Sequence, residues 1–205
     1  MSQLPLGHSP PPEPDPSISL EVFTAFQNGD GAAMQVIVER YHHRLIGFVR
    51  MIVWQRELAE ELAQEVFLEA YRRRREITRP ESLKSWLFTV ARRKAAKELA
   101  RKRYRVETFP GDEMIQDLAP AVHPSQAEGF QLEETAQVLH EILDEISPGD
   151  RELITLRFFG GLSYQEVADA MNLSIGSVGV KLNRALSRLK KRLEIRGLTM
   201  EDLMP

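Results

Sequence analysis

Two clusters of basic side chains carry the chemistry that the sequence offers most clearly. Residues 71–105 contain 14 Lys or Arg against 3 Asp or Glu, and residues 171–198 contain 7 against 1. Each cluster attracts polyanions locally, because salt screens surface charges beyond about 8–10 Å. The net charge of -3 for the whole chain therefore does not exclude a nucleic-acid partner. On charge alone, a solvated surface explains the clusters about as well.

Catalytic and metal-binding chemistry is poorly represented. The 205-residue chain has no cysteine, which excludes disulfides, thiol nucleophiles and cysteine-ligated metal centres and fits a reducing cytoplasm. The basic clusters hold almost no carboxylates for acid–base or metal chemistry. His42 and His43 are adjacent, so they point to different helix faces rather than to one metal ion. We expect no catalytic residue, no metal site and no cofactor.

The elements that position these side chains are helices. Apolar residues recur at three- and four-residue spacing, and no stretch alternates as a strand does for long. No apolar run approaches the ~20 residues that cross a bilayer, so we expect no membrane insertion and a cytoplasmic protein. The fold class predicted is all-α, with two small helical domains joined by a flexible linker.

Breaks in the helical pattern predict five segments. Six of the twelve prolines fall in residues 1–17, which we interpret as a disordered tail. An acidic stretch with no sustained period, residues 105–132, predicts a linker between a first domain at 18–104 and a second at 133–196. Residues 197–205 form a short C-terminal tail.

The second domain has the signals of a helix-turn-helix. Ser147 precedes Pro148 and predicts a helix start, and Phe158–Leu162 predicts its end. Ser163 and Glu166 form a capping box that begins a short second helix, which is predicted to end at Asn172. Ser174 then caps a last helix with one apolar stripe, including Ile175 and Val178, and one basic stripe. This arrangement can place a helix in the major groove of DNA, although an ordinary helical hairpin shares the pattern.

Four sequence blocks resemble a known family. Glu60–Tyr71, Ser85–Arg92, Leu162–Ala168 and Ser174–Val178 with Leu182, Arg184 and Ala185 resemble the bacterial RNA polymerase sigma factors of the extracytoplasmic-function (ECF) group of the sigma-70 family. The resemblance covers about residues 20–104 and 133–195, in the family's order and spacing. It implies a sigma factor that binds core RNA polymerase and directs promoter-specific initiation, with an anti-sigma factor as a further partner.

The resemblance also implies roles for individual residues. The helix that corresponds to region 2 would bind core polymerase through Glu60, Glu61, Gln64, Glu65 and Phe67. The next loop and helix would capture the melted minus-ten element through Arg79, Lys84, Trp86, Arg92, Arg93, Lys94 and Lys97. The last helix would correspond to region 4 and read the minus-thirty-five element through Ser174, Ser177, Gly179, Val180, Lys181, Arg184 and Arg188.

The chain departs from the family pattern in both reading segments. Arg93 stands where the family commonly has asparagine, and Lys97 where aspartate is often found. Gly179 and Val180 replace a basic-polar pair, so close backbone approach or apolar contact with a thymine methyl would have to replace polar base contacts. Trp86 fits either a core position or a base-stacking platform.

Two further classes of function compete with the sigma-factor interpretation. A stand-alone helix-turn-helix regulator would account for residues 147–192 but not for the acidic, glutamine-bearing helix around Gln64. A nuclease or other enzyme would require clustered carboxylates, which the basic segments lack.

Overall fold

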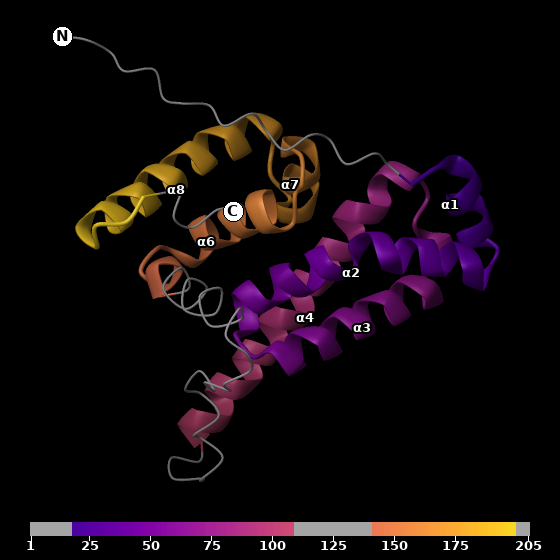
Figure 1. Ribbon diagram of the computed structural model, residues 1–205, viewed down its shortest axis with the longest axis horizontal. Helices are drawn as coiled ribbons and strands as arrows, with labels where there is room; N and C mark the ends of the chain where they lie inside the picture. Colours follow the sequence, from indigo (N-terminus) through magenta and orange to yellow (C-terminus); the bar gives the residue numbers. More distant parts are fainter. Residues whose placement is uncertain (1–17, 109–140, 200–205) are drawn as a thin grey trace.

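The computed structural model describes residues 18–108 and 141–199, and within these ranges its regular elements are all helical (Figure 1). The predicted tail at 1–17, most of the predicted linker at 105–132 and residues 200–205 lie outside the described residues. The elements are α1 (Leu20–Gln27), α2 (Gly31–Val53), α3 (Arg56–Arg72), the short helix η1 (Arg74–Glu76), α4 (Pro80–Thr108), α6 (Pro148–Ile154), the π-helix η3 (Thr155–Phe159), α7 (Tyr164–Met171) and α8 (Ile175–Ile195). The all-α prediction is confirmed for the described part of the chain.

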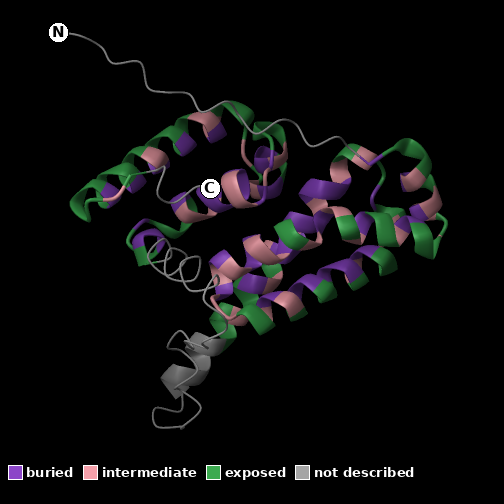
Figure 2. Ribbon diagram, viewed as in Figure 1, coloured by how far each residue is buried: buried purple, intermediate pink, exposed green. Residues whose placement is uncertain are grey.

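The first domain, α1 to α4, is a helical bundle built around α2. Asp30 ends the break between α1 and α2 by capping α2, since its carboxylate accepts a hydrogen bond from the amide of Ala32 at 2.7 Å. Phe48 of α2 and Phe88 of α4 meet edge to face, and both are fully buried. Figure 2 shows that the buried positions of α2, α3 and α4 lie on the sides where these helices pack together.

Two hydrogen bonds hold the end of α3 and the segment before α4 against the junction of α1 and α2. The Gln27 side-chain amide donates to the carbonyl of Ile77 at 2.8 Å, and the Tyr71 hydroxyl donates to the carbonyl of Gly29 at 2.9 Å. Gly29 has a φ of 90°, which favours glycine. These contacts fix the loop at residues 77–79 and thereby the point from which α4 departs.

The second domain, α6 to α8, has the helix ends that the sequence predicts. Ser147 caps α6, and Ser163 and Glu166 form a complete capping box at the start of α7. Asn172 ends α7 in the left-handed conformation, with a φ of 54°, and the Ser174 side chain accepts from the amide of Ser177 to cap α8. The two helices of the predicted helix-turn-helix are therefore α7 and α8.

The break predicted at Phe158–Leu162 begins later than expected, because the chain stays helical through Phe158 and Phe159 and leaves the helix at Gly160. The amide of Gly160 donates to the carbonyl of Thr155 at 2.9 Å, and the helix widens to a π-turn instead of ending at Phe158. A side chain at Gly160 would meet the carbonyl oxygen of Leu156 at 2.7 Å and the Phe88 ring at 3.0 Å. Glycine is thus required where η3 packs closely against the first domain.

The two domains pack against each other. Contacts join α4 to α7 and α2 to η3. Lys84 of α4 is 5% exposed, and its ammonium donates to the carbonyl of Gly161 at 2.5 Å. The sequence predicts two domains on a tether and does not anticipate this direct contact.

Candidate functional site

The exposed side of α3 carries the acidic and amide groups predicted to bind polymerase. Glu61 and Gln64 are exposed. Glu60 pairs at 3.0 Å with an arginine one turn earlier, and the Glu65 carboxylate lies 2.8 Å from the ammonium of Lys94. The part of α3 that stays open to solvent is therefore centred on Glu61 and Gln64, and its acidity suits a basic partner surface.

Phe67 lies in the core rather than on the predicted polymerase-binding surface. Its side chain is 5% exposed, and its ring stacks on His42 with 6.4 Å between the ring centroids. The apolar stripe of α3 is wide enough to include it, because Ala63 one turn earlier is also buried. Phe67 contributes to the stability of the domain in this arrangement.

Ion pairs between α3 and α4 occupy two of the basic residues predicted to bind the minus-ten element. The Lys94 ammonium lies 3.2 Å from Glu69, and the Arg93 guanidinium lies 3.1 Å from the same carboxylate. Burial opposes the ionisation of Glu69, but hydrogen bonds from Lys94 and Arg73 outweigh it and lower the pKa of Glu69. Burial likewise opposes the charge of Lys94, and its carboxylate partners nevertheless raise its pKa.

Three other members of the predicted minus-ten set lie outside these pairs. Arg79 and Lys97 are exposed and make no ion pair with any described residue. Trp86 is half-buried, and the guanidinium of Arg73 lies over its ring at 5.8 Å from the centroid. The structure therefore supports neither a fully buried Trp86 nor an open stacking platform, because an arginine covers the ring.

Lys84 and Arg92, which complete the predicted minus-ten set, face the second domain. The Lys84 ammonium lies 3.4 Å from the carboxylate of Glu166, besides its bond to a carbonyl oxygen. Arg92 donates to Glu152 of α6 at 2.8 Å. Glu166 also accepts from the amide of Ser163 at 2.7 Å, so a single carboxylate completes the helix cap and holds the domains together.

The outer face of α8 displays cations from a helix that is fixed by its apolar stripe. Val178, Leu182 and Leu189 are buried, whereas Lys181 and Arg184 are exposed. Ion pairs with described residues involve neither of these two cations, which leaves them available to a phosphate backbone. The Ser177 hydroxyl lies 2.7 Å from that of Ser174, so both serines belong to the helix start.

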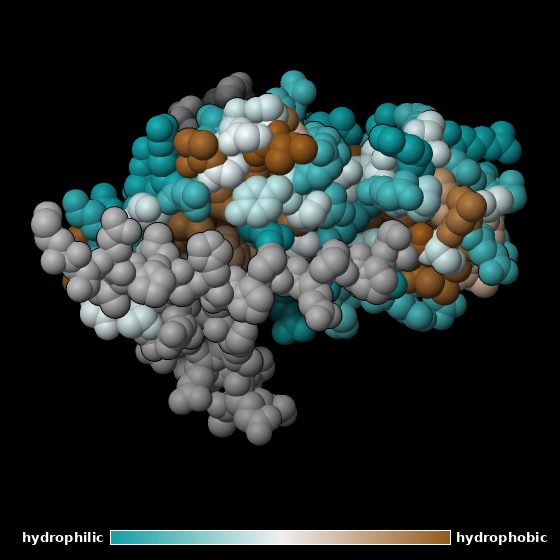
Figure 3. Space-filling view, turned by 90° about the horizontal axis from the view of Figure 1, so that it is seen from above, coloured by the Kyte–Doolittle hydropathy of each residue, from teal (hydrophilic) through white to brown (hydrophobic). Residues whose placement is uncertain are grey.

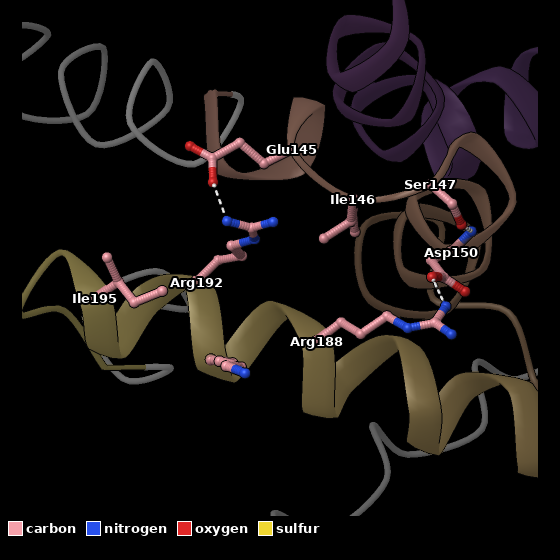
Figure 4. A pocket seen from close by; sticks show the side chains of 8 residues that line it. Glu145, Ile146, Ser147, Asp150, Arg188, Arg192 and Ile195 are labelled. Carbon is pink, nitrogen blue, oxygen red and sulfur yellow. Dashed lines mark hydrogen bonds and ion pairs between the residues drawn. The ribbon is translucent and has the colours of Figure 1, made fainter.

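Arg188 lies on the same side of α8 as Lys181 and Arg184, but its guanidinium turns back toward α6. Figure 4 shows its guanidinium directed at Asp150 of α6, with which it forms an ion pair, in a pocket between α6 and α8. A second pair joins Arg192 to Glu145 at 3.4 Å in the same pocket. Arg188 thus contributes to packing inside the second domain, and a phosphate would have to compete with Asp150 for it.

Gly179 and Val180 have different environments. Gly179 is partly buried, and a Cβ atom there would lie 3.9 Å from the ring of Tyr164 in α7. The Val180 side chain is 53% exposed. Of this pair, only Val180 presents a side chain to solvent. Ile175, the first residue of the predicted apolar stripe, is also exposed, at 50%, so the buried part of the stripe begins at Val178.

Sequence reasoning missed the two carboxylates that join the domains and a buried arginine inside the second domain. Glu152 and Glu166 pair with α4, and their partners lie 60 and 82 residues away, so no local pattern reveals them. Arg157 is 7% exposed, donates to the carbonyl of Leu162 at 2.7 Å and lies 5.3 Å from the Tyr164 ring centroid. Its position beside the aromatic residues Phe158 and Phe159 is the only signal in the sequence that it is buried.

Two kinds of site are absent from the described residues. Across 18–108 and 141–199, no group of three or more His, Asp or Glu side chains is arranged to hold a metal ion. None of the helices in these ranges is long and apolar enough to cross a membrane.

Comparison with protein families gives two matches. Residues 37–105 match the model of sigma-70 region 2, and residues 136–189 match that of sigma-70 region 4. The two models together span more than half of the chain.

Characterised relatives match over most of their length. The chain is 27% identical over 178 residues to the RNA polymerase sigma-H factor of Pseudomonas aeruginosa, covering 82% of this chain and 90% of the relative. It is 27% identical over 173 residues to the ECF RNA polymerase sigma-E factor of Escherichia coli, with the same two coverages.

Two solved structures have a similar fold. CnrH in complex with the cytosolic domain of CnrY superposes with a TM-score of 0.65 at 19% identity, covering 85% of this chain and 96% of the other. The sigma factor RpoE of Bartonella quintana in complex with the anti-sigma factor NepR superposes with a TM-score of 0.62 at 24% identity, covering 78% and 96%.

Proposed function

Because the chain belongs to the sigma-70 family and its relatives are ECF sigma factors, we propose that its described helices divide the contacts with polymerase and promoter between α3, α4 and α8. The chain directs promoter recognition by RNA polymerase through regions 2 and 4, and sigma factors are not enzymes. The assignment of individual residues within this framework is our proposal.

The contact with core polymerase is assigned to the exposed side of α3. Glu61 and Gln64 form its centre, and Glu60 and Glu65 lie on the same helix with carboxylates that already have intramolecular partners. A basic surface on the polymerase would be attracted by this acidic side and could take over those carboxylates. Phe67 is excluded from the contact as long as it remains in the core.

The contact with the melted minus-ten strand is assigned to α4 and the loop before it. Arg79 and Lys97 are open to solvent and are available without rearrangement. Lys84 and Arg92 lie against the second domain, so they can reach DNA only after the domains separate. We infer that the arrangement in Figure 1 is a closed form and that promoter binding requires an open one.

The contact with the minus-thirty-five element is assigned to the outer face of α8. Lys181 and Arg184 would bind phosphates and hold the helix in the major groove. The start of α8 at Ser174 supports this placement, because the first-turn amides that the Ser174 cap leaves unpaired also attract phosphate.

An anti-sigma factor is proposed as a further partner. The solved structures with a similar fold include a sigma factor bound to an anti-sigma factor, although that likeness by itself concerns the fold. We place the protein in the cytoplasm, where polymerase and promoter are found.

The observation that supports this proposal best is the presence in one chain of a capped helix-turn-helix with exposed cations and a separate bundle with an exposed acidic helix face. Run-off transcription with purified core polymerase on a promoter library tests it. Promoter-specific transcripts that require both the chain and core are expected. Tight duplex binding without core, and no transcripts with it, would favour a stand-alone regulator instead.

A further inference from the structure

The recognition helix α8 places one apolar side chain in the middle of its outward face. Successive helical residues are about 100° apart, so the buried residues Val178, Leu182 and Leu189 define the inward direction. Val180 lies nearly opposite this stripe, with 53% of its surface exposed. Burial in the domain therefore does not explain an apolar residue here.

The neighbours of Val180 leave its short side chain accessible to a deep groove. Gly176 lies one turn earlier on the same face, and a Cβ atom there would have no neighbour within 4 Å. Arg184 lies one turn later and Lys181 beside it, and both are exposed. A small apolar side chain that follows a glycine and is flanked by cations suits the DNA major groove, where the base edges lie at the bottom and the phosphates at the sides.

Figure 3, which views the molecule from above, shows small hydrophobic patches set among hydrophilic surface. Tyr164 of α7 is 40% exposed and packs toward Gly179. Gly179 thus serves the contact between the two helices, and Val180 is the member of the pair that can reach a base.

We propose that Val180 reads the 5-methyl group of a thymine in the upstream promoter element. Thymine is the only base that presents a methyl group in the major groove, and apolar side chains recognise it by contact. The contact substitutes for the polar readout that the Gly179–Val180 pair cannot provide. This inference rests on the proposed assignment of α8 to the upstream element.

The test replaces the thymines of that element by deoxyuridine, which removes the methyl group and leaves base pairing unchanged. Holoenzyme assembled from core and the full chain is titrated with the strongest promoter from the library and with its deoxyuridine counterpart. Wild-type holoenzyme should bind the deoxyuridine promoter about fourfold more weakly, the ratio expected for one buried carbon group. Deoxyuridine placed downstream of the start site serves as the control.

A Val180→Ala variant completes a double-mutant cycle. The variant should bind the thymine promoter about as weakly as the wild type binds deoxyuridine, and it should lose little more on deoxyuridine. Alanine is a better helix former than valine and the site is exposed, so the fold is preserved.

Three outcomes would overturn the inference. A wild-type affinity that is indifferent to deoxyuridine, with the upstream element still protected in a footprint, would refute methyl readout and leave the proposed function intact. Equal losses on deoxyuridine for wild type and Val180→Ala would assign the methyl contact to another residue. No upstream protection at all would refute the assignment of α8 itself.

Discussion

Replacing Glu166 by glutamine should open the two domains without damaging either. The glutamine side chain can still complete the capping box with Ser163, but it carries no charge for the ammonium of Lys84, 3.4 Å away. The side chains of Lys84 and Glu166 are 6% and 19% exposed, so water replaces the lost partner only in part. A charge-assisted contact of this kind contributes about 1.5 kcal/mol, which corresponds to roughly a tenfold shift toward the open form.

Chemical acetylation of lysine measures this shift directly. Lys84 is 5% exposed in the closed form and should react only when the domains separate, whereas Lys97 on the same helix is exposed throughout. The ratio of Lys84 to Lys97 acetylation, read by peptide mass spectrometry, therefore follows the open population. We expect this ratio to rise about tenfold in Glu166→Gln.

Asp169→Asn is the matched control. Asp169 lies in the same helix α7 and accepts from the Gln165 amide at 2.9 Å, so the variant removes the same charge without touching the first domain. Its acetylation ratio should equal that of the wild type. The reasoning is refuted if Glu166→Gln leaves the ratio unchanged, or if Lys84 of the wild type already reacts as fast as Lys97.

Three further outcomes are expected. Lys181→Ala and Arg184→Ala should each reduce the slope of log affinity against log salt for duplex promoter DNA by about 0.9, while Lys190→Ala, whose ammonium faces Glu194, leaves it unchanged. Gln64→Ala should weaken core binding by about tenfold in a pull-down titration, while the unfolding midpoint of the variant stays that of the wild type. Glu39→Ala, which changes an exposed residue of α2, is the control, and an equal loss of core binding in that variant would argue against a specific contact at Gln64. The pKa of Glu69 is lowered in the folded state, so its ion pairs stabilise the domain above the unfolded carboxyl pKa and this contribution is lost as the pH falls through the lowered, folded-state pKa. Glu69→Gln should therefore cost about 1 kcal/mol of unfolding free energy at pH 6 and less as the pH is lowered, and a cost that does not fall with pH would contradict the lowered pKa.

Local chemistry made the helix ends predictable. Ser163 with Glu166, and Asn172 after α7, satisfy backbone groups within a few residues of themselves, so their roles follow from spacing alone. The π-turn at Thr155–Phe159 did not follow, because the packing of Gly160 against Phe88 of the other domain decides whether the helix continues.

The roles of side chains on helix surfaces were less predictable, because they depend on what packs against each helix. Phe67 lies at the edge of an apolar stripe, and the packing of the domain, which includes its stack on His42, places it in the core. Lys84 and Arg92 belong to a basic segment that favours DNA, yet in the closed form carboxylates of the second domain hold both. The sequence identifies the charge but not its partner.

These ion pairs change what the basic segment can contribute to the salt dependence of promoter binding. Counterion release scales with the number of cations that exchange small ions for phosphates. Lys84, Arg92, Arg93 and Lys94 are already neutralised by carboxylates, so each must leave an intramolecular partner before it meets DNA. The freed carboxylate then takes up a cation and offsets the one released. In the full chain, the six cations predicted to bind the minus-ten element should therefore give single-stranded DNA binding a salt slope below the ~0.7 per cation expected for unpaired residues, because four of them begin in ion pairs. If the measured salt slope instead corresponds to all of these cations, the ion pairs are already broken before DNA binds.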